Sequence, residues 1–331
     1  MDRQICTTRI DLERMLFDES AQPQALPLSL LDEITNGFSE EKEIGRGGFA
    51  VVYKGILGTE TVAVKKLSHS YMHEKEYQRE VVCLMKLARH KNIVRFLGYC
   101  ADTQGSMYMS NKSFVLADLQ QRLLCFEYVP NKSLQDYITD ASRGIEWRKR
   151  YRIIKGVCEG LNYLHNNLIV HLDLKPGNIL MDENMEPKIA DFGLSRFIDE
   201  GQSMIMATKV SGTMGYMAPE IDSREVRPYY DIYSLGVIII EILTGKKGHQ
   251  RIDDVLDSWR NRLQEPVEDA ELEQIRVCFN IGNECIEYDP AMRPSTQNIL
   301  NRLKQTESAD EPSSVKVYIY VSQKNKVICA H

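Results

Sequence analysis

The chain has 331 residues, of which 43% are hydrophobic and 27% charged, and its formal net charge is −6. That length is enough for one large core or for two lobes that share a cleft. Because nucleic acids and anionic membranes are themselves negative, the charge balance argues against both as partners.

Signals for secretion, membrane insertion and disulfide bonding are missing from the sequence. The longest apolar run, residues 235–243, is far shorter than the roughly 20 residues of a membrane-spanning helix. The first residues lack a secretory signal and the Met-Gly start of myristoylation. The eight cysteines are scattered without a Cys-x-x-Cys pair, which indicates reduced, buried thiols. We therefore expect a cytoplasmic protein without a transmembrane segment, which a partner could bring to the plasma membrane.

Residues 1–37 are predicted to be an N-terminal arm with one short helix. The first 25 residues carry mixed charge and proline, and they are typical of an arm rather than a folded unit. Ser29 resembles a helix N-cap, with acidic Asp32 three residues later. Gly37 is a plausible stop for that helix.

Residues 38–128 favour a small lobe that is rich in strands. Runs of β-branched residues, such as residues 51–53 and 61–64, predict strands. One helix interrupts them, because Val81, Leu84, Met85 and Ala88 recur at helical spacing. Residues 101–122 have weak periodicity and are long for a connection between adjacent strands, so we expect an inserted surface loop there.

Residues 129–305 favour a larger, helical lobe. Apolar residues of 154–164 repeat every three or four positions, which predicts an amphipathic helix. Further helices are expected around residues 235–243, 254–263, 272–286 and 296–303. A β-rich part followed by an α-rich part predicts a bilobal α+β enzyme with its ligand between the lobes.

Residues 306–331 form a linker followed by a strand-like tail. Apolar and polar residues alternate over 315–322, which is the pattern of a strand. A single strand cannot bury its own face, so it either docks on the body or begins a further domain.

The most informative segment is His171-Leu172-Asp173-Leu174-Lys175-Pro176-Gly177-Asn178, with Asp191-Phe192-Gly193 after it. Phosphoryl transfer needs a carboxylate for the acceptor hydroxyl, a cation for the moving phosphate and oxygen ligands for Mg²⁺. Asp173, Lys175, Asn178 and Asp191 have these chemical types in this order. The segment resembles the eukaryotic protein kinases, and the resemblance implies ATP and Mg²⁺ as cofactors.

A glycine-rich segment, Gly45-Arg46-Gly47-Gly48-Phe49-Ala50, lies between two predicted strands and ahead of Lys65. Small residues there let backbone N–H groups approach phosphate oxygens. Ala50 replaces the third glycine of the family pattern. The resemblance implies that Lys65 contacts the α- and β-phosphates and pairs with Glu80, for which Glu76 is the competitor. The implied nucleotide contacts are Ile44, Gly45, Gly47, Gly48, Phe49, Ala50, Val52, Ala63, Lys65, Phe126, Glu127 and Val129.

Two features resemble the serine/threonine kinases in particular. Lys175 follows the candidate base Asp173 by two residues, and Thr213 matches the threonine that packs near that aspartate. Glu220 and Arg293 match a structural ion pair of the family. Asp231 matches the aspartate that holds the catalytic loop. The implied partners are proteins with serine or threonine hydroxyls.

Leu172 departs from the family, since most regulated kinases have arginine before the catalytic aspartate. Arginine at that position pairs with a phosphate on the activation loop, which leucine cannot do. We therefore expect that phosphorylation of Ser203, Thr208 or Ser211 is not the main switch to activity.

Residues 28–39, 130–134 and 212–220 resemble the plant receptor-like kinases, on their cytoplasmic branch. That resemblance implies an upstream receptor or co-receptor and, with Leu172, an association with defence signalling.

Two alternatives remain open. A pseudokinase could act as a scaffold or binding module, although such proteins usually lose the residues found here at Lys65, Asp173 or Asp191. The chain could also be part of a longer receptor or two-domain protein, in which the tail strand belongs to another domain.

Overall fold

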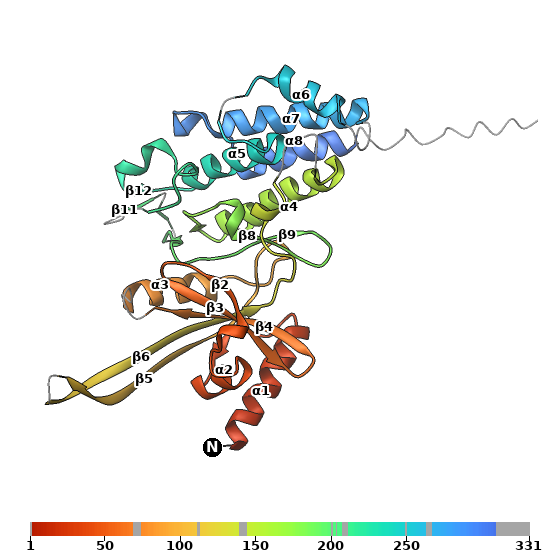
Figure 1. Ribbon diagram of the computed structural model, residues 1–331. Coiled ribbons are helices and arrows are strands. Elements are labelled where there is room, and N and C mark those ends of the chain that lie inside the picture. Colours follow the sequence, from red (N-terminus) through yellow and green to blue (C-terminus); the bar gives the residue numbers. More distant parts are fainter. Residues whose placement is uncertain are drawn as a thin grey trace, which may run out of the picture.

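A six-stranded sheet and a group of helices form the two halves of the molecule (Figure 1). The computed structural model describes residues 2–68, 74–110, 113–138, 144–199, 201–202, 204–206, 211–248, 250–262 and 267–308. The smaller half contains the sheet, and the larger half contains most of the helices. This is the mixed α+β, bilobal architecture that the sequence predicts.

The sheet of the smaller half has the strand order β1-β5-β6-β4-β3-β2. Strand β1 runs parallel to β5, and the other neighbours are antiparallel. Alternation along β4 sends Val62 and Val64 to one face and Ala63 and Lys65 to the other. The strands are β1 (Gln24–Ala25), β2 (Glu43–Arg46), β3 (Ala50–Leu57), β4 (Glu60–Leu67), β5 (Phe96–Ser110) and β6 (Ser113–Glu127).

The N-terminal residues belong to the smaller half, so the expectation of an arm outside the folded unit was wrong. Helix α1 (Asp2–Phe17) and helix α2 (Leu28–Ile34) pack on the face of the sheet that carries Val62 and Val64. Leu12 and Met15 of α1 are buried there. The mixed charge of this segment does not prevent packing, because a helix needs only one apolar stripe to dock on a sheet.

Helix α2 begins directly after Pro27, so the predicted N-cap at Ser29 was wrong. The Pro27 carbonyl accepts the N–H groups of Leu30 and Leu31 over 3.1 and 3.3 Å, which are the first hydrogen bonds of this helix. The predicted stop is present at Gly37, which has φ +68° and donates its N–H to the carbonyl of Asp32 over 2.8 Å.

Residues 101–122 form a long β-hairpin, so the predicted surface loop was wrong. Strands β5 and β6 pair continuously from Cys100 and Leu123 to Ser110 and Ser113, which leaves two residues between them. The outer part of this hairpin runs away from the other strands (Figure 1). Backbone ladder hydrogen bonds form whatever the side-chain pattern, so periodicity alone did not reveal the strands.

Helix α3 (Glu74–Met85) packs beside the sheet and contacts both β5 and β10 (Arg196–Phe197). Its buried residues are Tyr77, Glu80, Cys83 and Leu84. The predicted helix is therefore present, but it ends before Ala88.

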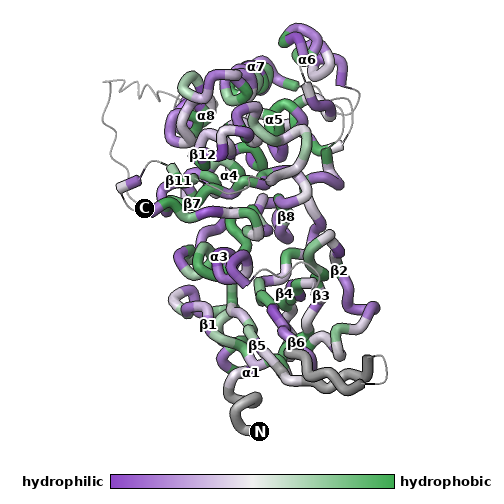
Figure 2. Tube along the Cα trace, turned by 90° about the vertical axis from the view of Figure 1, so that its left-hand side faces the viewer, coloured by the Kyte–Doolittle hydropathy of each residue, from purple (hydrophilic) through white to green (hydrophobic). Residues whose placement is uncertain are grey.

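The larger half contains the helices predicted from residue 154 onward. Its helices are α4 (Trp147–Asn166), α5 (Tyr229–Thr244), α6 (Ile252–Arg260), α7 (Asp269–Cys285) and α8 (Thr296–Ser308). Figure 2 shows hydrophobic residues concentrated along α4 and α5, inside this half. The short strands are β7 (Ile169–Val170), β8 (Ile179–Met181), β9 (Pro187–Ile189), β10 (Arg196–Phe197), β11 (Ile205–Met206) and β12 (Glu225–Val226). Single 3₁₀ turns lie at Glu40–Lys42, Leu134–Asp136, Pro176–Asn178, Pro219–Ser223 and Pro290–Met292.

The strand predicted in the tail lies outside the described residues, which end at residue 308. Among the described helices, none combines the length and the apolar character that crossing a bilayer requires.

Candidate active site

An ion-pair cluster that is buried at Lys65 and Glu80 and half exposed at Asp191 joins the smaller half to the larger one. The Lys65 ammonium on β4 lies 2.7 Å from Glu80 Oε1 on α3 and 2.9 Å from Asp191 Oδ1. Helix α3 presents Glu80 on its buried face, whereas Glu76 is exposed. The structure therefore pairs Lys65 with Glu80 and brings in Asp191 from 126 residues along the chain.

The charges in this cluster depend on one another. Burial alone would lower the pKa of Lys65, but the carboxylates of Asp191 and Glu80 outweigh it and raise that pKa. The Lys65 charge lowers the pKa of Asp191 to about 2, against the opposing effect of burial. Lys65 is therefore a cation and Asp191 an anion at neutral pH, as a site for phosphates and a metal ion requires.

Asp173 is held by hydrogen bonds from three side chains. Its Oδ1 accepts a hydrogen bond from the Thr213 hydroxyl over 2.7 Å. Its Oδ2 accepts from Lys175 Nζ over 2.7 Å and from Asn178 Nδ2 over 3.1 Å. Lys175 also donates to Thr213 Oγ1 over 2.8 Å. The four predicted residues therefore form one network, with a carboxylate at its centre.

A second carboxylate, which is fully buried, holds the backbone of the loop that carries Asp173. Asp231 on α5 accepts the backbone N–H groups of His171 and Leu172, each over 2.8 Å. Its Oδ2 also lies 3.0 Å from His165 Nε2 on α4. Leu172 has φ +68°, a strained conformation for leucine that these hydrogen bonds help to hold.

Phe192 fixes the segment that carries Asp191. It is fully buried, and its ring contacts the His171 ring edge to face, with 5.2 Å between the ring centroids. His171 Nε2 in turn lies 3.0 Å from the carbonyl oxygen of Ala190. Asp191 is thus held toward Lys65 by its neighbours on both sides.

Asp191 and Asn178 fit a divalent metal ion. The Asp191 side chain is 49% exposed, and Lys65 occupies only its Oδ1. Asn178 uses its amide nitrogen toward the Asp173 carbonyl and carboxylate, which orients the amide oxygen away from them. A carboxylate and an amide oxygen are ligands that Mg²⁺ accepts.

The glycine-rich segment forms the turn between β2 and β3. The Gly47 N–H donates to the Ala50 carbonyl over 2.9 Å. A Cβ atom at Gly48 would meet no described atom within 4 Å, so the space beside it is open to a ligand. Ala50 is buried at the start of β3, whereas Phe49 and Ile44 are exposed.

The predicted adenine contacts lie where β4 and β6 run side by side. Ala63 pairs with Phe126, and Val52 pairs with Lys65 on the adjacent strand. Phe126 is buried against Phe96, with 5.4 Å between the ring centroids. Within the described part of the chain, no backbone hydrogen bond uses the N–H or carbonyl of Val129, which leaves both for a ligand.

Ile198 and Ala218, which lie near the start and the end of residues 191–220, the predicted activation segment, belong to the same apolar cluster as Leu172. Leu172 is 9% exposed and shares an apolar cluster with Val170, Ile198, Val226 and Tyr230. Ser211 is half-buried, while Ser203 and Thr208 lie outside the described residues.

The predicted structural ion pair of the larger half is also present. Arg293 Nη2 lies 2.8 Å from Glu220 Oε2, and the Arg293 side chain is fully buried.

Three contacts at the site were missed from the sequence. They are the approach of His165 to Asp231, the ion pair of Lys188 with Glu127 over 2.8 Å, and the contact of Arg95 with Glu127. Sequence separations of 66, 61 and 32 residues leave no local spacing that could reveal them.

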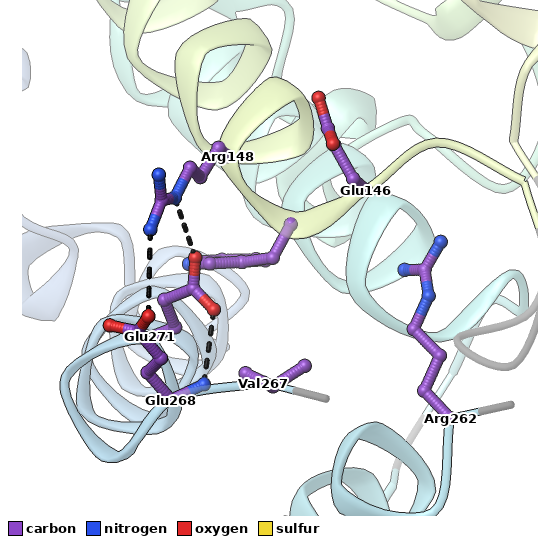
Figure 3. A pocket seen from close by; sticks show the side chains of 7 residues that line it. Glu146, Arg148, Arg262, Val267, Glu268 and Glu271 are labelled. Atoms are coloured by element: carbon purple, nitrogen blue, oxygen red, sulfur yellow. Dashed lines mark hydrogen bonds and ion pairs between the residues drawn. The ribbon is translucent and has the colours of Figure 1, made fainter. Parts of the chain in front are cut away.

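A separate pocket of about 320 Å³ opens in the larger half, at the start of α4 (Figure 3). Figure 3 shows two of its acidic side chains, Glu268 and Glu271, in capping and pairing interactions, such as Arg148 Nε to Glu271 Oε1 over 2.9 Å. Of the predicted site residues that the structure describes, none lines this pocket.

Comparison with known proteins agrees with this geometry. The sequence profile described as the protein kinase domain matches residues 38–303. Cysteine-rich receptor-like protein kinase 10 of Arabidopsis thaliana is 38% identical over 305 residues, which cover 85% of this chain and 43% of that protein. Cysteine-rich receptor-like protein kinase 7 from the same plant is 39% identical over 317 residues, or 88% of this chain and 45% of that protein. The chain thus spans less than half the length of these relatives.

The chain belongs to the protein kinase family and, within it, to the plant receptor-like kinases. A protein kinase domain uses ATP and a divalent metal ion to phosphorylate proteins.

Proposed function

We propose that this chain is an active serine/threonine protein kinase, which transfers the γ-phosphoryl group of MgATP to hydroxyl groups of protein substrates. The observation that carries this proposal is the hydrogen-bonded network around Asp173, formed by Lys175, Asn178 and Thr213. The network supplies a carboxylate for the acceptor and a cation beside it. In this proposal the ion pair of Lys65 with Asp191 marks the position of the nucleotide phosphates.

In this proposal Asp173 orients the acceptor hydroxyl and takes its proton as the oxygen attacks phosphorus. Lys175, 2.7 Å from Asp173, offsets the negative charge that gathers on the transferred group. Lys65 contacts the α- and β-phosphates, and Glu80 holds it in place. Asn178 and Asp191 hold Mg²⁺, which neutralises phosphate charge when bound.

The nucleotide pocket is proposed from the smaller lobe and the segment between the lobes. Ile44, Gly45, Gly47, Gly48, Phe49, Ala50 and Val52 cover the nucleotide from the glycine-rich turn. Ala63, Phe126, Glu127 and Val129 enclose the adenine. The open space at Gly48 and the unused backbone groups of Val129 support this assignment. We likewise propose residues 38–305 as the kinase domain, with its lobes meeting at residues 128 and 129.

Preference for serine and threonine is supported by Thr213. Its hydroxyl donates to Asp173 and accepts from Lys175, so it bridges the candidate base and the lysine, as the threonine of serine/threonine kinases packs near that aspartate. Lysine two residues after the base is the serine/threonine form of this loop.

The decisive test is transfer of radiolabelled phosphate from ATP to a generic protein acceptor such as casein. We expect signal from the parent protein and none from Lys65→Met or Asp173→Asn. Nucleotide binding without transfer in all three proteins would instead support the alternative, a pseudokinase that acts as a scaffold. Phosphoamino-acid analysis of the product tests the preference for serine and threonine over tyrosine.

Activity is proposed not to depend on phosphorylation at Ser203, Thr208 or Ser211. Buried Leu172 lies in an apolar cluster and offers no cation to a phosphate. The chain with all three residues changed to alanine should therefore keep its kcat within about twofold, because no charge-assisted contact is lost. Loss of activity in a variant that remains folded would contradict this.

We further propose that the kinase works in a reducing, cytoplasmic setting, downstream of a receptor or co-receptor. The described cysteines are free thiols, namely Cys83, Cys100, Cys125, Cys158, Cys278 and Cys285. The similar plant proteins are named as receptor-like kinases, which supports a receptor-linked role in signalling, including defence. A partner would bring the protein to the plasma membrane. Affinity purification with and without a reducible crosslinker would test the association.

A further inference from the structure

Arg95 connects the N-terminal segment to residues 126–129, the segment between the lobes that is called the hinge below. It directly precedes β5, and its side chain is buried, with 9% of the residue exposed. A buried guanidinium needs partners for its N–H groups, because leaving a charge without them costs several kcal/mol.

The guanidinium finds these partners at the end of α1. Arg95 Nη2 donates to the Asp18 carbonyl over 2.7 Å and to the Ala21 carbonyl over 3.4 Å. Arg95 Nη1 lies 3.5 Å from the Leu16 carbonyl. The last carbonyls of a helix lack partners within the helix and carry partial negative charge. Arg95 therefore caps α1 from a distant part of the chain.

The backbone of the same residue holds the hinge. The Arg95 N–H donates to Glu127 Oε1 over 2.8 Å, and its carbonyl accepts the Glu127 N–H over 3.0 Å. Lys188 Nζ donates to the same Glu127 oxygen over 2.8 Å. Lys188 lies on β9, three residues before Asp191. One residue thus joins α1 to the hinge and, through Glu127, to the strand that leads to the metal-binding aspartate.

The chain after α1 is docked on β5, the strand that Arg95 directly precedes. Leu26 donates its N–H to the Tyr99 carbonyl over 2.7 Å, and Gln24 of β1 pairs with Gly98. A Cβ atom at Gly98 would lie 2.2 Å from the Gln24 carbonyl oxygen, so glycine is required for β1 to approach. The N-terminal segment is therefore fixed at two points beside the hinge.

We propose that Arg95 is a positioning residue for nucleotide binding, which uses the docked N-terminal segment as an anchor for the hinge. This inference rests on the proposed binding of ATP at residues 126–129. In the full chain, Arg95→Gln should raise the KM for ATP on the order of three- to tenfold, because the hinge groups are displaced rather than removed. The kcat should stay within about twofold, since the described hydrogen bonds of Arg95 include none with a residue of the Asp173 network.

Separate measurement of KM and kcat distinguishes positioning from a loss of folded protein. Fewer folded molecules lower the apparent kcat and leave KM unchanged. Arg95→Lys, which keeps the charge but not the fork of donors, should fall between Arg95→Gln and the parent. Arg14→Gln is the matched control, because among the described residues its exposed side chain on α1 forms an ion pair only with Asp18 at the same helix end, at 3.8 Å. Its KM should equal that of the parent.

Gly98→Ala tests the anchor without changing Arg95. Displacement of β1 should raise the KM for ATP in the same direction, and this variant decides the matter if Arg95→Gln does not fold. Isothermal titration with ATP and MgCl₂ gives the affinity even if the parent transfers no phosphate, so failure of the proposed function is recognised separately. An unchanged KM and an unchanged affinity for ATP in folded Arg95→Gln and Gly98→Ala would overturn the inference.

Discussion

Lys65 is a buried cation whose charge depends on two carboxylates. Glu80 and Asp191 both lie within hydrogen-bonding distance of its ammonium group. The surroundings of the two carboxylates differ, because Glu80 is almost fully buried on α3 while the Asp191 side chain remains half exposed. Glu80 therefore couples Lys65 to α3, and Asp191 couples Lys65 to the segment around Phe192.

Glu80→Gln should lower kcat/KM about ten- to a hundredfold, since a charged hydrogen bond contributes about 1.5–3 kcal/mol. Steady-state kinetics with ATP as the varied substrate gives this value. Glu76→Gln is the matched control on the exposed face of the same helix, and it should behave like the parent. Equal losses in the two variants would show that α3 as a whole, rather than the Lys65 pair, sets the activity.

At the scale of elements, the packing of α5 against α7 fixes the start of the loop that carries Asp173. Helix α5 carries Asp231, which binds the backbone of His171 and Leu172. The two helices approach closely at Gly236, where a Cβ atom would lie 2.6 Å from Cys285 Cβ and 2.7 Å from the Gly282 carbonyl oxygen. Any side chain at this position must push the helices apart.

Gly236→Ala should therefore lower the free energy of unfolding by about 1–3 kcal/mol, the usual effect of overpacking a core. Chemical denaturation followed by far-UV circular dichroism measures the change. Gly48→Ala serves as the control for stability, because a Cβ atom there meets no described atom within 4 Å. A Gly236→Ala variant as stable as the parent would mean that α5 and α7 can shift without strain.

At the scale of the whole molecule, the sheet of the smaller half is covered on both faces. The cluster with Leu12, Leu31, Val62 and Leu123 lies on the outer face. A larger cluster continues from Leu84 and Phe126 through Phe192 into the helices of the other half. The six described thiols are distributed over these two cores.

Burial raises the pKa of Cys83 and of Cys100 to about 11 and that of Cys125 to about 12. At pH 8 these thiols are protonated in the folded protein, so they should not react with Ellman's reagent until the chain unfolds. The test uses Cys6→Ser/Cys329→Ser protein, because those two side chains lie outside the described part. Fast labelling of the folded variant at pH 8 would contradict the buried positions.

The same raised pKa values predict alkaline sensitivity. The unfolded thiols lose protons near pH 9, before the folded ones, so the unfolded state is favoured as the pH rises. The contribution of these cysteines to stability is complete below pH 9 and is lost between pH 9 and about 11 to 12. Denaturation midpoints measured from pH 8 to 11 should fall, and serine in place of Cys125 should flatten that slope.

The sequence by itself determined the class of protein, the candidate base and the partner of Lys65. Asp173, Lys175 and Asn178 lie within six residues, so their chemical types and their spacing can be recognised without knowledge of the fold. Glu80 could be preferred to Glu76 because helical periodicity assigns each to a face. Residues that are close in the chain are placed relative to one another by the local geometry of a helix or loop, and a sequence pattern encodes that local geometry.

Only the tertiary structure revealed the docked α1, the long β5–β6 hairpin and the contacts of Arg95 and His165. Each of these features joins residues that are distant in the chain. The contacts are made by backbone groups or by one apolar stripe of a helix, so they produce no characteristic spacing of residues in the sequence. The backbone hydrogen bonds of a sheet pair two strands whether their side chains are polar or apolar. A helix with mixed charge docks when a complementary face exists, and only the assembled sheet supplies that face.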